Sequence, residues 1–374
     1  MSLQTIALVT GGGDAPGLNA VIRAVVKTAT NEYGLRVLGI EDSFEGCLGE
    51  TNVRELRPED VRGLLPRGGT ILGTRNRGSF VVREGGRELR PEEVYGAAIE
   101  NLKRMGVDAV IAVGGEGTLA IASEFVRRDF PVVGVPKTID NDLAATELTF
   151  GFMTALDIAT EALDRLHTTA ESHDRVMVLE VMGRHAGWIA LHCGISGGAD
   201  VILLPEIPFS MEQVAKKIRE RDAGDAKFSI VVAAEGATEV EGEVKYLDRG
   251  DRASAARLGG LGHHLAAELG ERTGKEARCV VLGHMQRGGS PNAFDRMLAT
   301  NFGSSAVRAL ARGKSGVMVS LQAANIRTVP LEEAVATLKT VPPESQLVRC
   351  ARDVGISFGA PDEDSHHHHP GSDV

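Results

Sequence analysis

Pro131-Val132-Val133-Gly134-Val135 and the segment that follows it, Pro136-Lys137-Thr138-Ile139-Asp140-Asn141-Asp142, indicate both the fold and the chemistry of this chain. The apolar run predicts a short buried strand. The end of that strand delivers a lysine and two aspartates, and open α/β sheets bind their ligands at this edge. An extended segment would point Asp140 and Asp142 to the same side. A cation beside two anions suits phosphate, metal or proton transfer, whereas a solvated turn rich in Asp and Asn is the simpler alternative.

Strand-like and helix-like segments alternate along most of the chain, which predicts mainly parallel sheets covered by helices on both faces. The expected strands cover residues 6–9, 108–113, 131–135, 175–181, 201–204, 228–234, 277–282 and 316–321. The expected helices cover residues 18–30, 91–105, about 151–169, 211–221, 261–273 and 293–312, with two more after residues 118 and 184. We therefore predict an α/β protein with two Rossmann-like, three-layer α/β/α domains. The length of 374 residues also favours two domains over one.

The composition restricts the class of partner. The net charge of −10 at pH 7 argues against nonspecific nucleic-acid binding and against attraction to anionic membranes. No apolar run approaches the roughly 20 residues that span a bilayer, and no leader-like segment opens the sequence. The four cysteines are scattered without metal or redox spacing. These features predict a cytoplasmic protein with reduced thiols.

Three glycine-rich turns predict contacts with anions, because glycine lets backbone N–H groups approach a phosphate closely. Residues 11–17, Gly-Gly-Gly-Asp-Ala-Pro-Gly, lack both the Walker lysine and the dinucleotide spacing. Residues 114–118, Gly-Gly-Glu-Gly-Thr, place Glu116 where it could hold Mg²⁺, although an acid that compensates the helix dipole is the simpler interpretation. The arginines of residues 67–77 could clamp phosphate or could simply be solvated.

Two further polar blocks follow predicted strands. Met182-Gly183-Arg184 would offer backbone and guanidinium groups to a substrate. Residues 283–291, Gly-His-Met-Gln-Arg-Gly-Gly-Ser-Pro, contain His284 and Arg287 as candidate phosphate ligands. A single histidine or arginine in such a place is usually structural, but so many blocks at strand ends favour a ligand site.

Four of these blocks together resemble the 6-phosphofructokinase family: residues 12–19, 137–142, 182–184 and 286–291. The match runs in order from about Thr5 to about Leu321. The resemblance implies phosphoryl transfer from ATP to the 1-hydroxyl of fructose 6-phosphate, giving fructose 1,6-bisphosphate, with Mg²⁺ as cofactor. It also implies a donor-binding domain of residues 1–150 with about 284–335, and a fructose-6-phosphate-binding domain of residues 151–283 with about 336–358. The polar tail, residues 359–374 with its run His366–His369, is predicted to be disordered.

The resemblance assigns roles to the matching residues on the donor side. Asp140 would be the base that takes the proton of the 1-hydroxyl. Arg75 would stabilise the transferring phosphoryl group, with Arg77 as the alternative because the spacing here departs from the common pattern. The metal carboxylates would be Glu116, where many relatives carry aspartate, and Asp142. The donor-binding residues would be Gly13, Arg75, Asn76, Gly115, Glu116, Gly117, Thr118 and Lys137.

On the substrate side, the resemblance implies that Thr138 and Arg184 also take part in catalysis. Arg175 and Arg278 match arginines that reach the 6-phosphate bound by a neighbouring subunit, so a monomer would have an incomplete site and a tetramer or dimer is expected. The substrate-binding residues would be Thr138, Ile139, Asp140, Arg175, Met182, Gly183, Arg184, Glu235, Arg278, His284, Met285, Gln286 and Arg287.

Two positions bear on the phosphoryl donor. Gly117 matches the position where pyrophosphate users of the family carry aspartate, which would fill and charge the space needed by the α-phosphate of ATP. Lys137 matches a glycine in the familiar ATP-using bacterial enzymes and a lysine in pyrophosphate users, yet a lysine can neutralise phosphate from either donor. Some actinobacterial-type relatives combine this glycine with this lysine and use ATP, and the polar insertion 239–260 resembles that branch. We therefore predict ATP, with a pyrophosphate-dependent enzyme as the alternative.

Two other classes of protein compete with this prediction. A non-catalytic sugar-phosphate sensor on the same fold would be expected to lose the base or the metal carboxylate, and both Asp140 and Glu116 are present. A dinucleotide-binding dehydrogenase would need a glycine fingerprint and a ribose-binding acid that this chain lacks.

Overall fold

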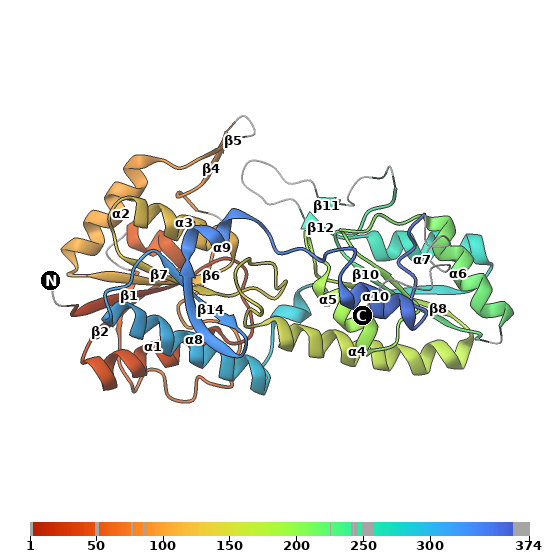
Figure 1. Ribbon diagram of the computed structural model, residues 1–374, viewed down its shortest axis with the longest axis horizontal. Helices are drawn as coiled ribbons and strands as arrows, with labels where there is room; N and C mark the ends of the chain where they lie inside the picture. Colours follow the sequence, from red (N-terminus) through yellow and green to blue (C-terminus); the bar gives the residue numbers. More distant parts are fainter. Residues whose placement is uncertain are drawn as a thin grey trace. The chain divides into compact units, whose positions relative to one another are not determined.

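The computed structural model describes residues 3–48, 52–75, 78–84, 87–224, 226–240, 242, 246–248 and 257–361 (Figure 1). The chain divides into two compact units. The first consists of Met1–Thr154 and Arg287–Lys339, and the second of Ala155–Gln286 and Thr340–Val374. The first boundary between them falls inside helix α4 (Phe152–His173).

A seven-stranded sheet forms the middle of the first unit, in the order β15-β14-β7-β6-β1-β2-β3. The strands are β1 (Thr5–Thr10), β2 (Arg36–Ile40), β3 (Val53–Leu56), β6 (Ala109–Gly114), β7 (Val132–Pro136), β14 (Val317–Gln322) and β15 (Asn325–Pro330). The five central strands are parallel to their neighbours, and the two edge strands, β3 and β15, are antiparallel.

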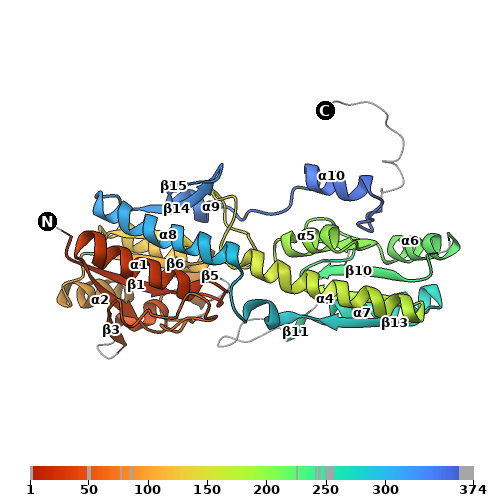
Figure 2. The same cartoon turned by 90° about the horizontal axis from the view of Figure 1, so that it is seen from below.

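Helices pack on both faces of this sheet, against alternating side chains of its strands (Figure 1). The helices are α1 (Leu18–Tyr33), α2 (Glu92–Arg104), α3 (Glu116–Arg127), α8 (Ala293–Ala311) and α9 (Leu331–Ala336). Two of them, α1 and α8, lie side by side on one face (Figure 2). Ile6 and Leu8 of β1 pack into the cluster that contains α1 and α8, whereas Ala7 and Val9 pack into the cluster that contains α2, α3 and α9. Each fully buried aliphatic side chain stabilises the fold by about 1.5–3 kcal/mol.

The second unit contains a four-stranded parallel sheet in the order β13-β8-β10-β9. Its elements are α4, β8 (Val176–Val181), α5 (Trp188–Ser196), β9 (Val201–Leu203), α6 (Met211–Ala223), β10 (Ser229–Ala234), α7 (Leu261–Thr273), β13 (Ala277–Val281) and α10 (Gln346–Asp353). Val201 and Leu203 pack with α6 and α7. The side chain of Ile202 points to the other face of the sheet, toward α5. It packs directly on Gly194 of that helix, where an added Cβ would lie 2.4 Å from it. The predicted α/β class with mainly parallel sheets is confirmed.

The remaining short elements lie outside the two sheets. Strands β4 (Val82–Glu84) and β5 (Arg87–Leu89) form one antiparallel pair, and β11 (Tyr246–Asp248) and β12 (Arg257–Leu258) form another. The predicted insertion 239–260 therefore contains strand residues, while most of its other residues lie outside the described part.

The end of the chain is ordered slightly further than its composition predicts. The backbone carbonyl of Gly359 accepts a hydrogen bond from the N–H of Ser210 at 2.8 Å, and the N–H of Gly359 donates to Ser357 Oγ at 3.0 Å. Gly359 therefore belongs to the fold rather than to a disordered tail, and the run His366–His369 lies outside the described residues. Within the described residues, no helix combines the length and the apolar character needed to cross a bilayer.

Candidate active site

The candidate site lies at the carboxyl edge of the seven-stranded sheet. Strands β1 and β6 are neighbours there, but the chain leads from β1 toward β2 and β3, and from β6 toward β7 and β14. The loops that follow β1 and β6 therefore diverge, and open α/β sheets bind their ligands at such a point. The loop after β7 reaches the same edge because β7 is parallel to β6.

The glycine turn after β1 is fixed by the segment that ends at Arg75. The N–H of Gly12 donates to the carbonyl of Arg75 at 3.1 Å, and Thr74 Oγ1 donates to the carbonyl of Gly12 at 2.5 Å. Gly12 has a φ of +76°, a conformation that favours glycine. A Cβ on Gly11 would lie 2.7 Å from Oγ1 of Thr118, so the glycine turns after β1 and β6 are in contact.

Lys137 connects the loop after β7 to this glycine turn. Its side chain is buried, and its ammonium group donates a hydrogen bond to the backbone carbonyl of Gly13. Burial, helped by the nearby Arg287 guanidinium, lowers the pKa of Lys137 from 10.5 to about 7. Three carboxylates oppose this shift: Asp14, Asp140 and Asp142. Two close cations at a glycine turn provide the charge that a polyphosphate needs.

The structure places Arg287 against the donor-side turn. Its Nη1 donates to the carbonyl of Asp14 at 3.1 Å, and a Cβ on Gly13 would lie 2.7 Å from the same nitrogen. This arginine was expected among the substrate ligands. Its contacts within the first unit are with the turn predicted to bind the donor.

The second glycine turn begins helix α3, whose first residue is Glu116. The Glu116 side chain is exposed at the positive end of that helix. A Cβ on Gly115 would lie 3.4 Å from the carbonyl of Lys137, so these two turns are also adjacent. By contrast, a Cβ on Gly117 would meet nothing within 4 Å. The space above Gly117 is therefore open.

The acidic segment after β7 turns sharply at Asn141. The N–H of Asp140 donates to Thr138 Oγ1 at 3.1 Å, which fixes the backbone of the predicted base. Asn141 is buried with a φ of +51°, and its Oδ1 accepts from the N–H of Thr149 at 3.1 Å. Thr149 Oγ1 donates to the carbonyl of Thr138 at 2.7 Å. These bonds close the loop that carries Asp140 and Asp142.

Lys339 is part of this site, and sequence reasoning missed it. Its ammonium group donates to Asn141 Oδ1 at 2.9 Å, and its N–H donates to the carbonyl of Asp142 at 2.8 Å. An isolated lysine just after a helix carries no signal in a single sequence. Only the fold brings Lys339, nearly two hundred residues away in sequence, to the acidic loop.

Arg75, the predicted phosphoryl-stabilising arginine, lies beside the glycine turn after β1. Arg75 Nη2 pairs with Asp42 Oδ2 at 3.1 Å, and both side chains are about half exposed. The alternative Arg77, and Asn76 beside it, lie outside the described residues.

Most of the predicted substrate residues of the second unit, all but Arg175 and Arg278, gather at the carboxyl ends of β8, β10 and β13. Buried Gln286 holds two of these ends together, because its Oε1 accepts from the N–H of Met182 at 2.7 Å. Gly183 has a φ of +145°, and a Cβ there would lie 2.8 Å from a backbone carbonyl. The N–H of Gly236, next to Glu235, donates to the carbonyl of Gly183 at 3.1 Å. Three exposed side chains surround this group: Arg184, His284 and Met285.

Arg175 and Arg278 lie at the opposite edge of the same sheet. Arg175 directly precedes β8, whereas Met182 directly follows it, so the strand separates them by about 20 Å. Both arginines pair with Glu276, at 2.8 Å and 2.6 Å, and these bonds, led by that from Arg175, hold the pKa of the Glu276 carboxyl below its usual value. Within one unit, these two arginines cannot meet the group around Met182.

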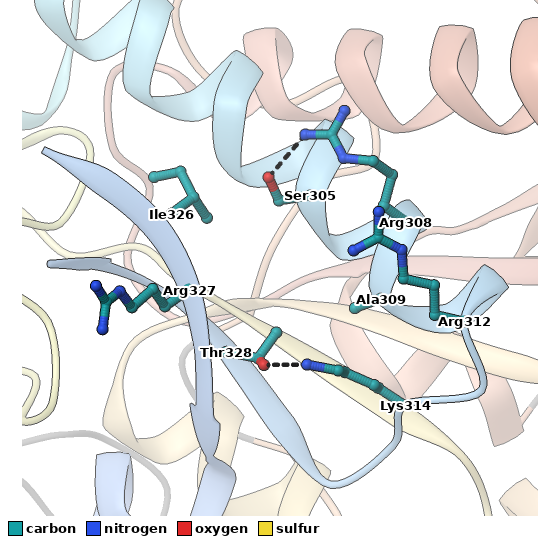
Figure 3. A pocket seen from close by; sticks show the side chains of 8 residues that line it. All are labelled: Ser305, Arg308, Ala309, Arg312, Lys314, Ile326, Arg327 and Thr328. Atoms are coloured by element: carbon teal, nitrogen blue, oxygen red, sulfur yellow. Dashed lines mark hydrogen bonds between the residues drawn. The ribbon is translucent and has the colours of Figure 1, made fainter.

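A hollow of about 190 Å³ at the carboxyl end of α8 lies apart from these loops (Figure 3). Arg308 donates to Ser305 Oγ at 3.0 Å, and Lys314 donates to Thr328 Oγ1 at 2.8 Å. Cations are favoured at the end of a helix because they face its negative pole. The helix end therefore accounts for them, and we leave the hollow out of the candidate site.

A family model described as "Phosphofructokinase" matches residues 5–310, which include every loop described above except the segment of Lys339. The chain belongs to the phosphofructokinase family. The resemblance read from its motifs is thereby confirmed. A phosphofructokinase of known structure, that of Pichia pastoris in the T-state, superposes with a TM-score of 0.78 at 33% identity, covering 90% of this chain and 38% of that one.

Two curated relatives of this phosphofructokinase-family chain differ in the donor that their names give. An ATP-dependent 6-phosphofructokinase of Chloroflexus aggregans is 57% identical over 95% of this chain and 98% of its own length. A pyrophosphate–fructose 6-phosphate 1-phosphotransferase of Amycolatopsis methanolica is 52% identical over 91% of this chain and 96% of its own length. Both types of enzyme are thus close relatives of the chain.

Proposed function

We propose that this protein transfers the γ-phosphoryl group of ATP to the 1-hydroxyl of fructose 6-phosphate, giving fructose 1,6-bisphosphate and ADP. The observation that carries the proposal is the meeting of three loops, after β1, β6 and β7, at one sheet edge. They combine two glycine turns, the ammonium group of Lys137 and the carboxylate of Asp140, and Arg287 contacts the first of these turns. Phosphoryl transfer to an alcohol requires groups of these kinds, to bind and neutralise the phosphates and to accept the proton of the alcohol.

Asp140 is the proposed general base. Its carboxylate accepts the proton of the 1-hydroxyl as the hydroxyl oxygen attacks the γ-phosphorus. The bond from that phosphorus to the bridging oxygen then breaks, and ADP leaves. The Thr138 hydroxyl, which accepts from the N–H of Asp140, fixes the backbone from which the base extends. A positioned base of this kind typically accelerates a reaction by about 10²–10⁴-fold.

The open space at Gly117 supports ATP as the donor. A nucleotide has an α-phosphate that pyrophosphate lacks, and that group needs room beside the glycine turn. A Cβ at Gly117 would meet nothing within 4 Å, so the backbone leaves such room. Lys137 supports either donor, because a buried ammonium group next to Gly13 would neutralise phosphate oxygens of both.

Mg²⁺ fits the carboxylates at this edge. No group of three or more His, Cys, Asp or Glu side chains forms a metal cage in the described part of the chain. Mg²⁺ often takes only one or two carboxylates and completes its shell with phosphate oxygens and water. Glu116, exposed on the first turn of α3, and Asp142 would provide these carboxylates. The bound ion would neutralise charge on the transferring phosphates.

The second unit would bind fructose 6-phosphate through the group around Met182, Arg184 and His284. Arg175 and Arg278 would serve a neighbouring subunit, since β8 separates them from that group within their own unit. The protein would then act as a homo-oligomer. A phosphate arriving from a neighbour would compete with Glu276 for the two arginines.

The test is turnover of fructose 6-phosphate with ATP and with pyrophosphate, each with and without Mg²⁺. We expect Mg²⁺-dependent turnover with ATP. Preference for pyrophosphate would favour the alternative donor. Asp140→Asn should lower turnover by at least about 100-fold and leave fructose-6-phosphate binding intact. Binding without any turnover in the unmodified protein would instead indicate a non-catalytic sugar-phosphate sensor.

A further inference from the structure

The loop that carries Asp140 leaves β7 and returns at Phe150, which bridges to Lys137. Two of its residues with side chains lie in the left-handed region: Asn141, with a φ of +51°, and Ala145, with a φ of +59°. That conformation costs an ordinary residue roughly 1–2 kcal/mol relative to the right-handed region. The loop must therefore be held by its surroundings to keep this shape.

The ammonium group of Lys339 donates hydrogen bonds into this loop. Its Nζ lies 2.9 Å from Asn141 Oδ1, 2.9 Å from the carbonyl of Thr146 and 2.9 Å from the carbonyl of Glu147. A lysine ammonium group has three N–H donors, so these bonds use all of them. The side chain is half-buried, which strengthens each bond relative to water.

The opposite side of the loop is held by β14. Ser320 Oγ donates to the carbonyl of Ala145 at 2.5 Å, and the N–H of Leu321 donates to Thr146 Oγ1 at 3.1 Å. The loop thus lies between the end of β14 and Lys339. Removing the ammonium group of Lys339 would leave the β14 contacts and the bond from Thr149 to Asn141 in place. It would take away one of the bonds that hold Asn141, the residue next to Asp140.

We propose that Lys339 is a positioning residue for phosphoryl transfer, which fixes the turn at Asn141 and thereby aims the carboxylate of Asp140. The inference rests on the proposed function, in which Asp140 is the base. Lys339 is also the last residue of the first unit, where the chain passes into the second. One of the three places where the chain passes between the units therefore also anchors the catalytic loop.

Lys339→Met tests this proposal, because methionine keeps the length of the side chain and removes its donors. We expect kcat to fall by about 10–100-fold, as expected for misplacing a catalytic group by about 1 Å, while the KM for fructose 6-phosphate changes little. Lys339→Arg should recover part of the lost kcat. Lys314→Met is the matched control, since Lys314 also lies in the first unit but bonds only Thr328. It should leave kcat unchanged.

The same substitution in an Asp140→Asn background separates positioning from general stability. If Lys339 acts through Asp140, Lys339→Met should lower the residual kcat of that background by less than about twofold, because coupled residues are not additive. A full, additive loss in both backgrounds would overturn the proposal, as would a lower melting temperature with unchanged kcat. High activity of Asp140→Asn itself would instead refute the proposed base and leave the loop contacts of Lys339 as observed.

Discussion

The ammonium group of Lys137 donates to the backbone carbonyl of Gly13, which joins the loop after β7 to the glycine turn after β1. Lys137 is thus a structural part of the donor-side turn as well as a candidate phosphate ligand. Because burial and Arg287 lower its pKa to about 7, much of it is neutral just above that pH.

Donor binding should therefore take up a proton. A phosphate group close to Lys137 favours the charged ammonium form and raises its pKa. At pH 8 we expect ATP binding to be accompanied by proton uptake, and donor affinity to fall as the pH rises through about 7. Calorimetry in two buffers of different ionisation enthalpy measures the uptake. Lys137→Met should abolish it, and equal heats in both buffers for the unmodified protein would contradict the prediction.

Lys137 should also make stability depend on pH. Its folded pKa is below its unfolded value of 10.5, so the unfolded chain binds the extra proton between about pH 7 and 10.5. The contribution of Lys137 to stability therefore rises with pH across this window and is smallest below it. Urea unfolding at pH 7.5 and 9.5 should show a steeper rise for the unmodified protein than for Lys137→Met. If the stability of the two proteins changed equally between these pH values, the predicted contribution of Lys137 would be refuted.

Gly117→Asp should change the donor without changing the fold. A Cβ there meets nothing within 4 Å and Gly117 does not need a positive φ, so we expect an unchanged melting temperature. The new carboxylate would occupy and charge the space for the α-phosphate, and kcat/KM for ATP should fall by at least about tenfold, or about 1.4 kcal/mol.

Gly96→Asp provides the control for this prediction. Gly96 also lies in a helix, α2, and a Cβ there meets nothing within 4 Å. It should change neither the melting temperature nor the use of ATP. If Gly117→Asp used ATP as well as Gly96→Asp does, the open space at Gly117 would not be where the nucleotide binds.

Two inactive variants should restore activity when their subunits mix. Asp140→Asn removes the base, whereas Arg278→Ala removes a group that would act on a neighbour's substrate. A hybrid interface between them would contain one site with both groups intact. We expect each variant alone to be nearly inactive and a mixture, unfolded and refolded together, to recover a substantial fraction of the activity. A mixture no more active than its components would place Arg278 in its own subunit's site or outside any site.

Gln286 should be needed for the substrate group of the second unit. Its side chain is fully buried and bonds the N–H of Met182 and the carbonyl of Ala155. Gln286→Leu would leave both backbone groups without this partner, at about 1–3 kcal/mol for each buried polar group. We expect a lower melting temperature and a higher KM for fructose 6-phosphate. Val354→Ala, at an exposed position of the same unit that is not among the predicted substrate ligands, is the control and should do neither.

Much of the fold could be predicted because its central strands are short apolar runs that end at glycine or acidic turns. The helix 261–273 was predicted with the bounds that the structure has. The edge strand β15 was not predicted, because Asn325–Pro330 is mostly polar without a regular alternation and gains its pairing from β14. Strand β3 gave a similarly weak local signal, whereas β2 contains the apolar run Val37–Ile40 and could have been predicted.

The candidate site was predictable where chemistry follows a strand directly. Asp140 and Glu116 lie just past β7 and at the start of α3, so their places follow from the strand pattern. Contacts that depend on distant packing could not be predicted in this way. Lys339 reaches Asn141 only through the tertiary fold, and Arg287 contacts the donor turn although its motif suggested the substrate.

The open space at Gly117 also bears on how such enzymes diverge. A change from glycine to aspartate needs a single base substitution in the codon, and here it would require no repacking of neighbours. Selection for the use of ATP or pyrophosphate would therefore act on this position without lowering the stability of the fold. Relatives named for different donors would then stand at similar distances from one sequence, as those of Chloroflexus aggregans and Amycolatopsis methanolica do.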